Sequence, residues 1–243
     1  MEKEVKSQPS GFLLIDKPAG ITSHDVVDRL RWVTGIRRIG HSGTLDPFAT
    51  GLLICGIGAA TKRLGVLLKL SKTYEATMHF GATSDTGDLT GRMTVGIKSN
   101  EEGIGGNELT AAFEKFVGDI EQIPPMYSAK KMRGQKLYVL ARRGETVERV
   151  PQHVTIHALE LHRFEWPIAE IKVSCSSGTY IRTLVEDIGR ALRVGAYTEA
   201  LRRTAIGDWR VEDAVTLDLL TGEQWHQYLK GLEHTGQSSQ RSV

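Results

Sequence analysis

The stretch TYEATMHF, residues 73–80, carries the clearest structural pattern in the chain. Side chains point alternately to the two faces of a β-strand, so a period of two sorts them into two sets. One set is Tyr74, Ala76, Met78 and Phe80, and the other is Thr73, Glu75, Thr77 and His79. We therefore predict a β-strand here that turns one apolar face to a core.

Segments on both sides of this strand extend the pattern. Apolar runs predict a strand in GFLLIDKPAG (11–20), ending in a Pro-Gly turn, a strand at 51–58, and a hairpin of 153–161 with 170–177. Apolar stripes predict three helices. The first is capped by Ser23 and ended by Gly35, and the second is a short helix before Gly118, marked by Leu109, Phe113, Phe116 and Val117. The third begins near Thr179, and its apolar stripe consists of Ile181, Leu184, Val185, Ile188 and Leu192. Residues 99–108, SNEEGIGGNE, predict a flexible surface loop.

The order of these elements indicates the fold class. Strands and helices are interleaved but hairpin pairs are frequent, which predicts an α+β fold with a mixed, largely antiparallel central sheet and flanking helices. A chain of 243 residues suits one large domain, with or without a small appendage. We expect a polar leader at 1–10, the main domain at 11–210, and a short, partly disordered tail at 211–243 that cannot fold alone.

Charge is unevenly distributed, although the formal net charge is only +2. Residues 128–150 hold seven Lys or Arg against two Glu, and four arginines form a second basic cluster between residues 29 and 38. A local basic face suits a polyanionic partner, because phosphate contacts release counterions. The alternative is a solvated surface, which is the commoner role of a run of charges.

The two cysteines, Cys55 and Cys175, lie in apolar strand-like runs and form no C-x-x-C motif, so we expect reduced core residues. The first ten residues contain no apolar segment typical of a secretory signal. No apolar run approaches the roughly 20 residues that a membrane helix needs. We expect a cytoplasmic protein that does not contact a membrane.

The stretch GHSGTLDPFATG, residues 40–51, surrounds one carboxylate, Asp46, with small residues. Pro47 keeps Asp46 out of the helical region, so the acid should lie on an extended or turn segment. Asp46 could simply bond its own backbone in a turn. The uncrowded neighbourhood favours another role, because a carboxylate can attack a sugar carbon as a nucleophile. Glycoside hydrolysis usually needs two carboxylates, and this motif supplies one.

Two further residues have candidate roles. Arg182 falls in the first turn of a predicted helix, where the helix dipole disfavours a cation. Its guanidinium could hold a carboxylate ionised, or form an ordinary surface pair with Glu186. Tyr74 lies near the start of its strand and could stack on a base, although a plain core tyrosine is more frequent.

Several other patterns do not predict a site. His153 and His157 have a metal-like spacing, but four residues of strand separate them by about 13 Å. GIGAATKR lacks the G-K-[ST] ending of a phosphate loop, and the chain has no G-x-S-x-G. We therefore expect no metal, no nucleotide cofactor and no serine hydrolase.

Six ordered blocks between about Gly11 and Trp209 resemble the TruB-type tRNA pseudouridine synthases. They are DKPAGITSHDVV (16–27), GHSGTLDPFATGLL (40–53), KTYEATMHFGATSDTGD (72–88), QIPPMYSAKKMRGQKLYVLARRG (122–144), CSSGTYIRTLVEDIG (175–189) and LRRTAIG (201–207). The resemblance implies the pseudouridine synthase fold and isomerisation of a uridine in the tRNA T-loop, at position 55, without a cofactor. Extruding that uridine costs a few kcal/mol, which stacking and phosphate contacts must offset.

The resemblance also implies roles for single residues. Asp46 would be the nucleophile, Tyr74 would stack on the uracil, and Arg182 would pair with Asp46. Leu201 would pack against the base, His41 would lie near the RNA backbone or fill the space the base has left, and Lys17 and Pro18 would shape the pocket wall. Lys130 and Arg143 belong to the block 128–143, which would face the tRNA T-arm. We expect a monomer.

One departure from the bacterial pattern is that no full C-terminal PUA-type domain follows Trp209, which predicts a weaker or more salt-sensitive grip on tRNA outside the T-arm. Two other classes stay open. One is an RNA-binding or RNA-remodelling protein whose catalysis is incidental, and the set of Asp46, Tyr74 and Arg182 argues against a purely binding role. The other is an aspartate-nucleophile hydrolase, which the lack of a second acid or metal cluster disfavours.

Overall fold

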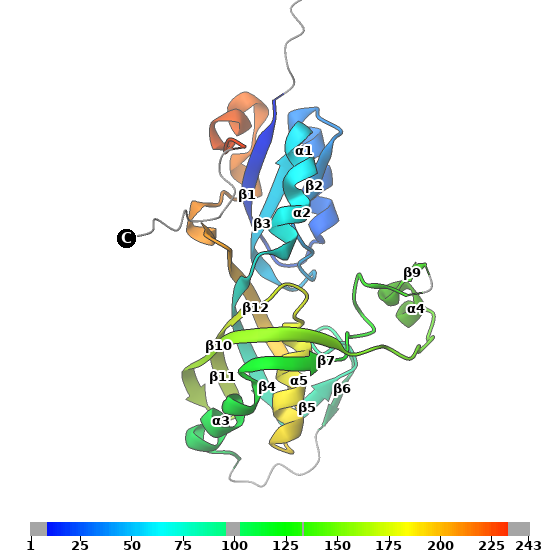
Figure 1. Cartoon of the computed structure of the whole chain (residues 1–243), viewed down its shortest axis with the longest axis vertical. Coiled ribbons are helices and arrows are strands. Elements are labelled where there is room, and N and C mark those ends of the chain that lie inside the picture. The colour runs from blue at the N-terminus through cyan, green and yellow to red at the C-terminus, as the bar shows by residue number, and fades with distance from the viewer. Residues whose placement is uncertain (1–8, 96–102, 133, 233–243) are drawn as a thin grey trace, which may run out of the picture. The chain divides into compact units, whose positions relative to one another are not determined.

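The computed structural model describes residues 9–95, 103–132 and 134–232. The chain forms two compact units (Figure 1). The first unit combines residues up to Leu70 with those from Arg203 onward, and the second comprises Ser71–Arg202. Of the expected leader, only Pro9 and Ser10 lie among the described residues. The expected domain at 11–210 stays a prediction, because a compact unit need not coincide with a functional domain.

The first unit is built on a pair of antiparallel strands. β1 (Gly11–Lys17) pairs with β3 (Thr50–Ile57) from Gly11 opposite Ile57 to Lys17 opposite Gly51. β2 (Ile39–His41) extends β3 on one side, and β13 (Trp209–Arg210) pairs with the end of β12 (Ala196–Ile206). The helices of this unit are α1 (Ser23–Thr34), α2 (Leu64–Lys69) and the 3₁₀ segments η1 (Gly58–Arg63), η3 (Val211–Asp213), η4 (Leu217–Leu219) and η5 (Gly222–Tyr228).

Both faces of the β1–β3 pair are buried, which explains their continuous apolar sequences. One face packs on α1 and on the C-terminal segment, in a cluster of Leu13, Ile15, Val26, Val27, Leu30, Ile36, Ile39, Leu53, Cys55, Ile57, Leu220 and Trp225. The other face packs on α2 and β13, in a cluster of Phe12, Leu14, Leu52, Ile54, Ala60, Leu64, Leu67, Ile206, Trp209 and Val211. Residues 211–232 thus contribute to the core of the first unit, whereas residues 233–243 of the expected tail lie outside the described residues.

The second unit is an antiparallel sheet with helices. Its strands follow the order β12, β4 (Lys72–Phe80), β11 (Ile168–Cys175), β10 (Gln152–Glu165) and β7 (Gly118–Gln122). The helices α3 (Gly106–Phe113) and α5 (Ile181–Ala191) pack on it, and the 3₁₀ segment η2 (Glu114–Phe116) follows α3. β5 (Ala82–Ser84) and β6 (Met93–Val95) form a separate ribbon. The predicted face of β4 is confirmed, because Tyr74, Ala76, Met78 and Phe80 are all buried.

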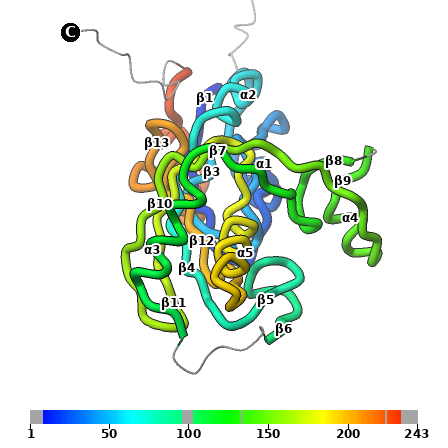
Figure 2. Tube along the Cα trace, turned by 60° about the horizontal axis from the view of Figure 1, so that its bottom comes forward, coloured from blue at the N-terminus to red at the C-terminus, as the bar shows by residue number. Residues whose placement is uncertain are grey.

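One segment of the second unit projects from its sheet. β8 (Lys131–Met132), β9 (Gln135–Lys136) and α4 (Leu137–Arg142) lie together beyond the end of β7 in both views (Figures 1 and 2). This projecting segment coincides with the most basic part of the sequence.

The α+β class and the largely antiparallel sheet are confirmed. Among the described helices, none combines the length and the apolar character needed to cross a bilayer.

Three local predictions were wrong. Thr22, not Ser23, caps α1, because Thr22 and Asp25 form a reciprocal capping box and the Ser23 side chain is buried. Helix α3 begins at Gly106, inside the loop that was expected to be flexible. Residues 99–102 of that loop lie outside the described part of the chain. Gly118, with φ of +96°, begins β7, a strand that the polar sequence GDIEQ did not reveal.

Gly51 provides the first testable prediction. Its φ is +99°, and a Cβ atom there would lie 2.3 Å from the carbonyl oxygen of Arg203 and 2.8 Å from its nitrogen. Both atoms belong to the backbone and cannot move aside. We expect Gly51→Ala to lower the free energy of unfolding by about 3 kcal/mol or more.

Urea unfolding would measure this loss, with Gly35→Ala as the matched control. Gly35 also has a positive φ, +69°, but its Cβ would meet nothing within 4 Å. The control should therefore lose only about 1 kcal/mol, from backbone strain. Equal losses in the two variants would contradict the close approach of Arg203 to Gly51.

Candidate active site

Asp46 lies on the segment that joins β2 to β3, and its side chain is half-buried. The segment turns at Asp46, whose carbonyl accepts a hydrogen bond of 3.1 Å from the Ala49 nitrogen. Leu45 is fixed by the buried Ser23 hydroxyl, which accepts from the Leu45 nitrogen (2.9 Å) and donates to the Leu45 carbonyl (3.1 Å). The residue expected to cap α1 instead holds the backbone next to the candidate nucleophile.

Lys17 supports the other side of the Asp46 turn. Its side chain is fully buried at the end of β1, and Nζ donates to the carbonyls of Pro18 (2.8 Å), Ile21 (2.8 Å) and Pro47 (3.3 Å). Burial lowers the pKa of Lys17 to about 8, and the charge of Asp46 partly opposes that shift. The expected role in shaping a pocket wall stays a prediction, but the contact with the Asp46 turn is clear.

Arg203, which the sequence did not single out, is a second buried cation beside this turn. Only 1% of its surface is exposed. Its Nε donates to the Leu52 carbonyl (2.8 Å) and its Nη2 donates to the Gly43 carbonyl (3.2 Å). The Asp46 turn is therefore held by one cation at Gly43 and by another at Pro47.

His41 lies on β2 opposite Cys55. Burial lowers the pKa of His41, and the nearby positive charge of Arg203 lowers it further. The imidazole is therefore neutral at pH 7 and can pack or share a hydrogen bond without adding a third cation beside Arg203 and Lys17. Its expected position near RNA stays a prediction.

Arg182 lies in the first turn of α5, as predicted, and is buried. Its Nη1 lies 3.5 Å from Oδ2 of Asp88, and both side chains are almost fully buried. Nη1 also donates to the Thr86 carbonyl, and Nη2 donates to the Tyr127 carbonyl (2.7 Å). The alternative of an exposed surface pair with Glu186 is therefore wrong. Pairing with Asp46, which belongs to the other unit, stays a prediction.

Asp88 is a functional candidate that sequence reasoning missed. Its Oδ1 accepts hydrogen bonds from the Thr86 hydroxyl (2.9 Å), the Thr90 nitrogen (2.9 Å) and the Thr90 hydroxyl (2.5 Å). Its other oxygen faces Arg182. Asp88 therefore orients Arg182 within the second unit. The block that ends in SDTGD contains this acid, but no local rule connects it with a residue 94 positions away.

Gln122, at the end of β7, was also missed. Its amide forms two bonds to the backbone of Tyr180, because Nε2 donates to the Tyr180 carbonyl (3.2 Å) and Oε1 accepts from the Tyr180 nitrogen (2.9 Å). Tyr180 immediately precedes α5. Gln122 therefore fixes the start of the helix that carries Arg182.

The remaining expected contacts to substrate are Tyr74 and Leu201, on β4 and β12. Tyr74 is 9% exposed and pairs across the sheet with Val173, and Leu201 is 7% exposed. Both lie in the second unit, as Arg182 does. Their contacts with a base stay predictions.

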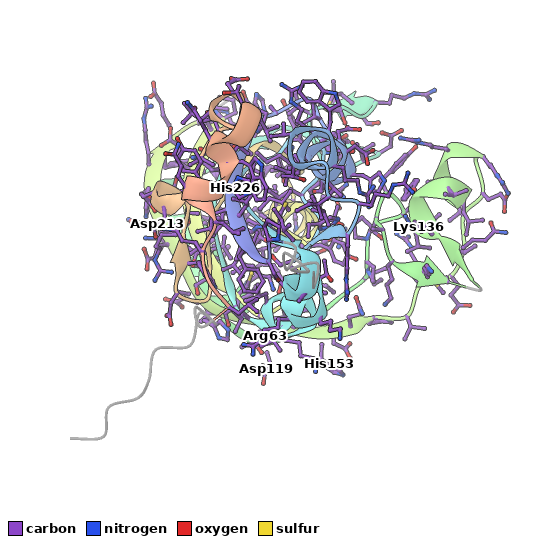
Figure 3. All side chains as sticks on the ribbon, turned by 90° about the horizontal axis from the view of Figure 1, so that it is seen from above. Arg63, Asp119, Lys136, His153, Asp213 and His226 are labelled. Atoms are coloured by element: carbon purple, nitrogen blue, oxygen red, sulfur yellow. The ribbon has the colours of Figure 1, made fainter. Side chains whose placement is uncertain are left out.

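The projecting segment presents cations and an aromatic ring. Tyr138 has the Lys136 Nζ and the Arg142 guanidinium carbon each 5.5 Å from its ring centre. Figure 3 shows Lys136 on this segment. Arg143 is exposed and Lys130 is partly exposed. Such a surface suits contacts with phosphates and bases. The RNA-facing role of Lys130 and Arg143 stays a prediction that these contacts favour.

The histidines with metal-like spacing have separate neighbours. His157 Nε2 lies 3.1 Å from the Ser71 hydroxyl, and His153 Nε2 lies 3.5 Å from a Glu121 oxygen. Within residues 9–95, 103–132 and 134–232, no group of three or more His, Cys, Asp or Glu side chains could hold a metal ion. Cys55 and Cys175 are buried free thiols, as predicted, and burial raises their pKa values to about 12 and about 11.

The N-terminal domain model of the TruB family pseudouridylate synthases matches residues 31–181, which include Asp46 and Tyr74. The chain belongs to the TruB family. A second model, described as the tRNA pseudouridylate synthase B C-terminal domain, matches residues 182–234. This membership confirms the resemblance stated from the sequence and the enzyme class that it predicts.

Bacterial relatives support the same family. The "tRNA pseudouridine synthase B" of Bordetella avium is 49% identical over 216 residues, which cover 88% of each protein. The protein of the same name from Pseudomonas paraeruginosa is 47% identical over 218 residues, 90% of this chain and 71% of that protein. Among solved structures, a Cbf5-Nop10-Gar1 complex gives a TM-score of 0.71 at 28% identity, covering 93% of this chain and 61% of that chain.

Glu186, on α5 of this TruB-family chain, provides a prediction about pH. Burial raises the pKa of Glu186 to about 7, and Arg182 partly opposes the shift. Because this pKa exceeds the ordinary value, the stability that Glu186 contributes is full below about pH 4.5 and is lost as the pH rises through 7. We expect Glu186→Gln to raise the free energy of unfolding by about 1–2 kcal/mol at pH 8.

Urea unfolding at pH 5, 6.5 and 8 tests this. The gain in Glu186→Gln should shrink steadily toward pH 5. Glu160→Gln, at a position whose side chain is 59% exposed, is the control and should stay close to the parent protein throughout. A gain in Glu186→Gln that does not change with pH would contradict the burial of an ionised Glu186.

Proposed function

We propose that this protein isomerises the T-loop uridine at position 55 of tRNA to pseudouridine, acting as a monomer in the cytoplasm. The family match over residues 31–181 carries the proposal. The names of the Bordetella and Pseudomonas relatives support tRNA as the substrate. The position within the T-loop rests on the resemblance of the sequence blocks.

The proposed reaction needs no co-reactant. The bond from C1′ to N1 of the uridine breaks, the uracil turns, and a bond forms from C1′ to C5. C5 then loses its proton to solvent, directly or through a base, and N1 gains one. The product is an isomer of the substrate, so the reaction has no net redox change and consumes no water.

Asp46 is the proposed nucleophile, and its surroundings suit that role. A half-buried carboxylate on a turn is accessible, and the neighbouring cation Lys17 favours its ionised form. Backbone bonds from Ser23, Lys17 and Arg203 fix the turn before substrate arrives. Such pre-organisation lowers the barrier, because the reactive group need not be ordered during the reaction.

The other proposed roles concern the extruded nucleotide. Tyr74 stacks on the uracil and assists removal of the C5 proton, and Leu201 packs against the base. Arg182, oriented by Asp88, pairs with the nucleophile. The projecting segment, with Lys130 and Arg143, holds the T-arm, and its phosphate contacts help to offset the cost of extrusion.

Tritium release tests the proposal directly. A T-arm hairpin with [5-³H]uridine at the target position loses its label to water only when C5 forms a new bond. We expect one tritium released per hairpin, and none from a hairpin that carries the labelled uridine in the stem. Tight binding without release would instead indicate an RNA-binding protein, and release of free uracil would indicate a hydrolase.

A further inference from the structure

Arg203 contacts no reacting atom in the reaction as proposed, yet it is among the largest side chains that are fully buried in the described part of the chain. Burial of an arginine is expensive unless the guanidinium is well paired. Both of its hydrogen bonds in the described structure go to backbone carbonyls, those of Leu52 and Gly43. Leu52 belongs to β3, and Gly43 belongs to the segment that carries Asp46. One guanidinium thus connects the catalytic turn to the sheet.

Two glycines allow the backbone of the Asp46 turn to lie close to Arg203. Gly43 and Gly51 flank the Asp46 turn, and both have positive φ, +120° and +99°. A Cβ at Gly51 would collide with the Arg203 backbone, and a Cβ at Gly43 would lie 3.8 Å from Arg203 Nη1. The two ends of the turn therefore meet at the same arginine.

Lys17 contacts the turn at a different point. Its Nζ donates to the Pro47 carbonyl, one residue after Asp46, whereas Arg203 holds the Gly43 carbonyl, three residues before it. The charge of Arg203 helps to lower the pKa of Lys17, and the fold keeps both cations buried nonetheless. Burial of two like charges beside one turn is explained if both hold the backbone of that turn in place.

We propose that Arg203 is a positioning residue that holds the Asp46 turn in its reactive geometry. The inference rests on the proposed function, in which Asp46 attacks the nucleotide. Arg203 acts through the Gly43 and Leu52 carbonyls and does not touch the substrate. Its loss should therefore slow the chemical step and leave RNA binding intact, because a small displacement of a reacting group costs rate more than affinity.

The test compares Arg203→Met, Arg203→Gln and Arg203→Lys with two controls. Single-turnover tritium release at saturating hairpin gives the rate, and hairpin binding gives Kd. For Arg203→Met we expect a rate about 100-fold lower and a Kd within about threefold of the parent. Arg203→Lys keeps the charge but can reach only one carbonyl well, so its rate should be intermediate. If Arg203→Met does not fold, Arg203→Gln replaces it in the comparison.

Hydrogen exchange supplies a readout that does not depend on catalysis. The amides of Ser42, Leu45 and Ala49 are hydrogen-bonded in the turn. They should exchange at least about tenfold faster in Arg203→Met, whereas amides of α5 should not change. Faster exchange in Arg203→Met, combined with a parent protein that makes no pseudouridine, would refute the proposed function and leave the structural role of Arg203 standing.

The controls separate positioning from general loss of stability. Leu14→Ala removes a core side chain of the same unit without touching the turn, and Arg210→Met removes an exposed arginine that also donates to carbonyls. At a temperature where all variants are folded, both controls should keep the parent rate. A rate for Arg203→Met within threefold of the parent, or equal slowing in Leu14→Ala, would overturn the inference.

Discussion

Replacement of Asp46 by asparagine should abolish tritium release from the T-arm hairpin, lowering the rate by at least about 10⁴-fold. Asparagine has nearly the shape of aspartate, but its amide is a very poor nucleophile. The turn should keep its conformation, because the bonds from Arg203, Ser23 and Lys17 go to backbone atoms. The loss would therefore be chemical and not structural.

Binding of the hairpin to Asp46→Asn should persist, within about threefold of the parent Kd, because phosphate contacts supply most of the affinity. Asp28→Asn is the matched control. Asp28 lies on α1, is 56% exposed in its pair with Arg31, and should be dispensable for turnover. Measurable single-turnover release by Asp46→Asn, checked for deamidation by mass spectrometry, would remove Asp46 from the mechanism.

Replacement of Arg182 by methionine should cause the second large effect, on stability as well as on activity. The Arg182–Asp88 pair is buried, with 4% and 6% of the two side chains exposed. Without Arg182, the buried Asp88 carboxylate would keep its hydrogen bonds from the neutral groups of Thr86 and Thr90 and would lose its cationic partner. We expect a loss of about 3–5 kcal/mol in the free energy of unfolding, because an uncompensated buried charge is costly.

A double-mutant cycle tests the cause of that loss. Asp88→Asn removes the charge, so Arg182→Met combined with Asp88→Asn should recover a substantial part of the stability in urea unfolding. Activity should stay low in the double variant, since Arg182 is still missing from the proposed site. Additive losses of stability would show that the two charges do not interact, contrary to the structure.

The sequence predicted elements well where local pattern and tertiary structure agree. The strand around Tyr74 and the striped helix around Leu184 bury the predicted faces. β7 was missed because its burial depends on strand β10, whose paired residues lie 30 to 38 positions further along the chain. Thr22 and Ser23 are both good caps, and only the fold decides between them, because Leu45 occupies the Ser23 hydroxyl.

The candidate site shows the same division. Asp46 was found because small residues and a proline surround it, and Arg182 because a cation in a first helical turn opposes a local rule. Asp88, Gln122 and Arg203 were missed because their partners are distant in the sequence. The contacts join residues that are 58 to 160 positions apart. Such residues carry no local signature, so the sequence of one chain cannot reveal them.

Modification mapping of tRNA tests the central claim most directly. Unmodified tRNA transcripts are incubated with the parent protein or with Asp46→Asn, and each pseudouridine is then located along the chain. We predict one new pseudouridine, at the T-loop uridine numbered 55, with the parent protein and none with Asp46→Asn. Modification at a different uridine, or equal modification by both proteins, would contradict the assignment.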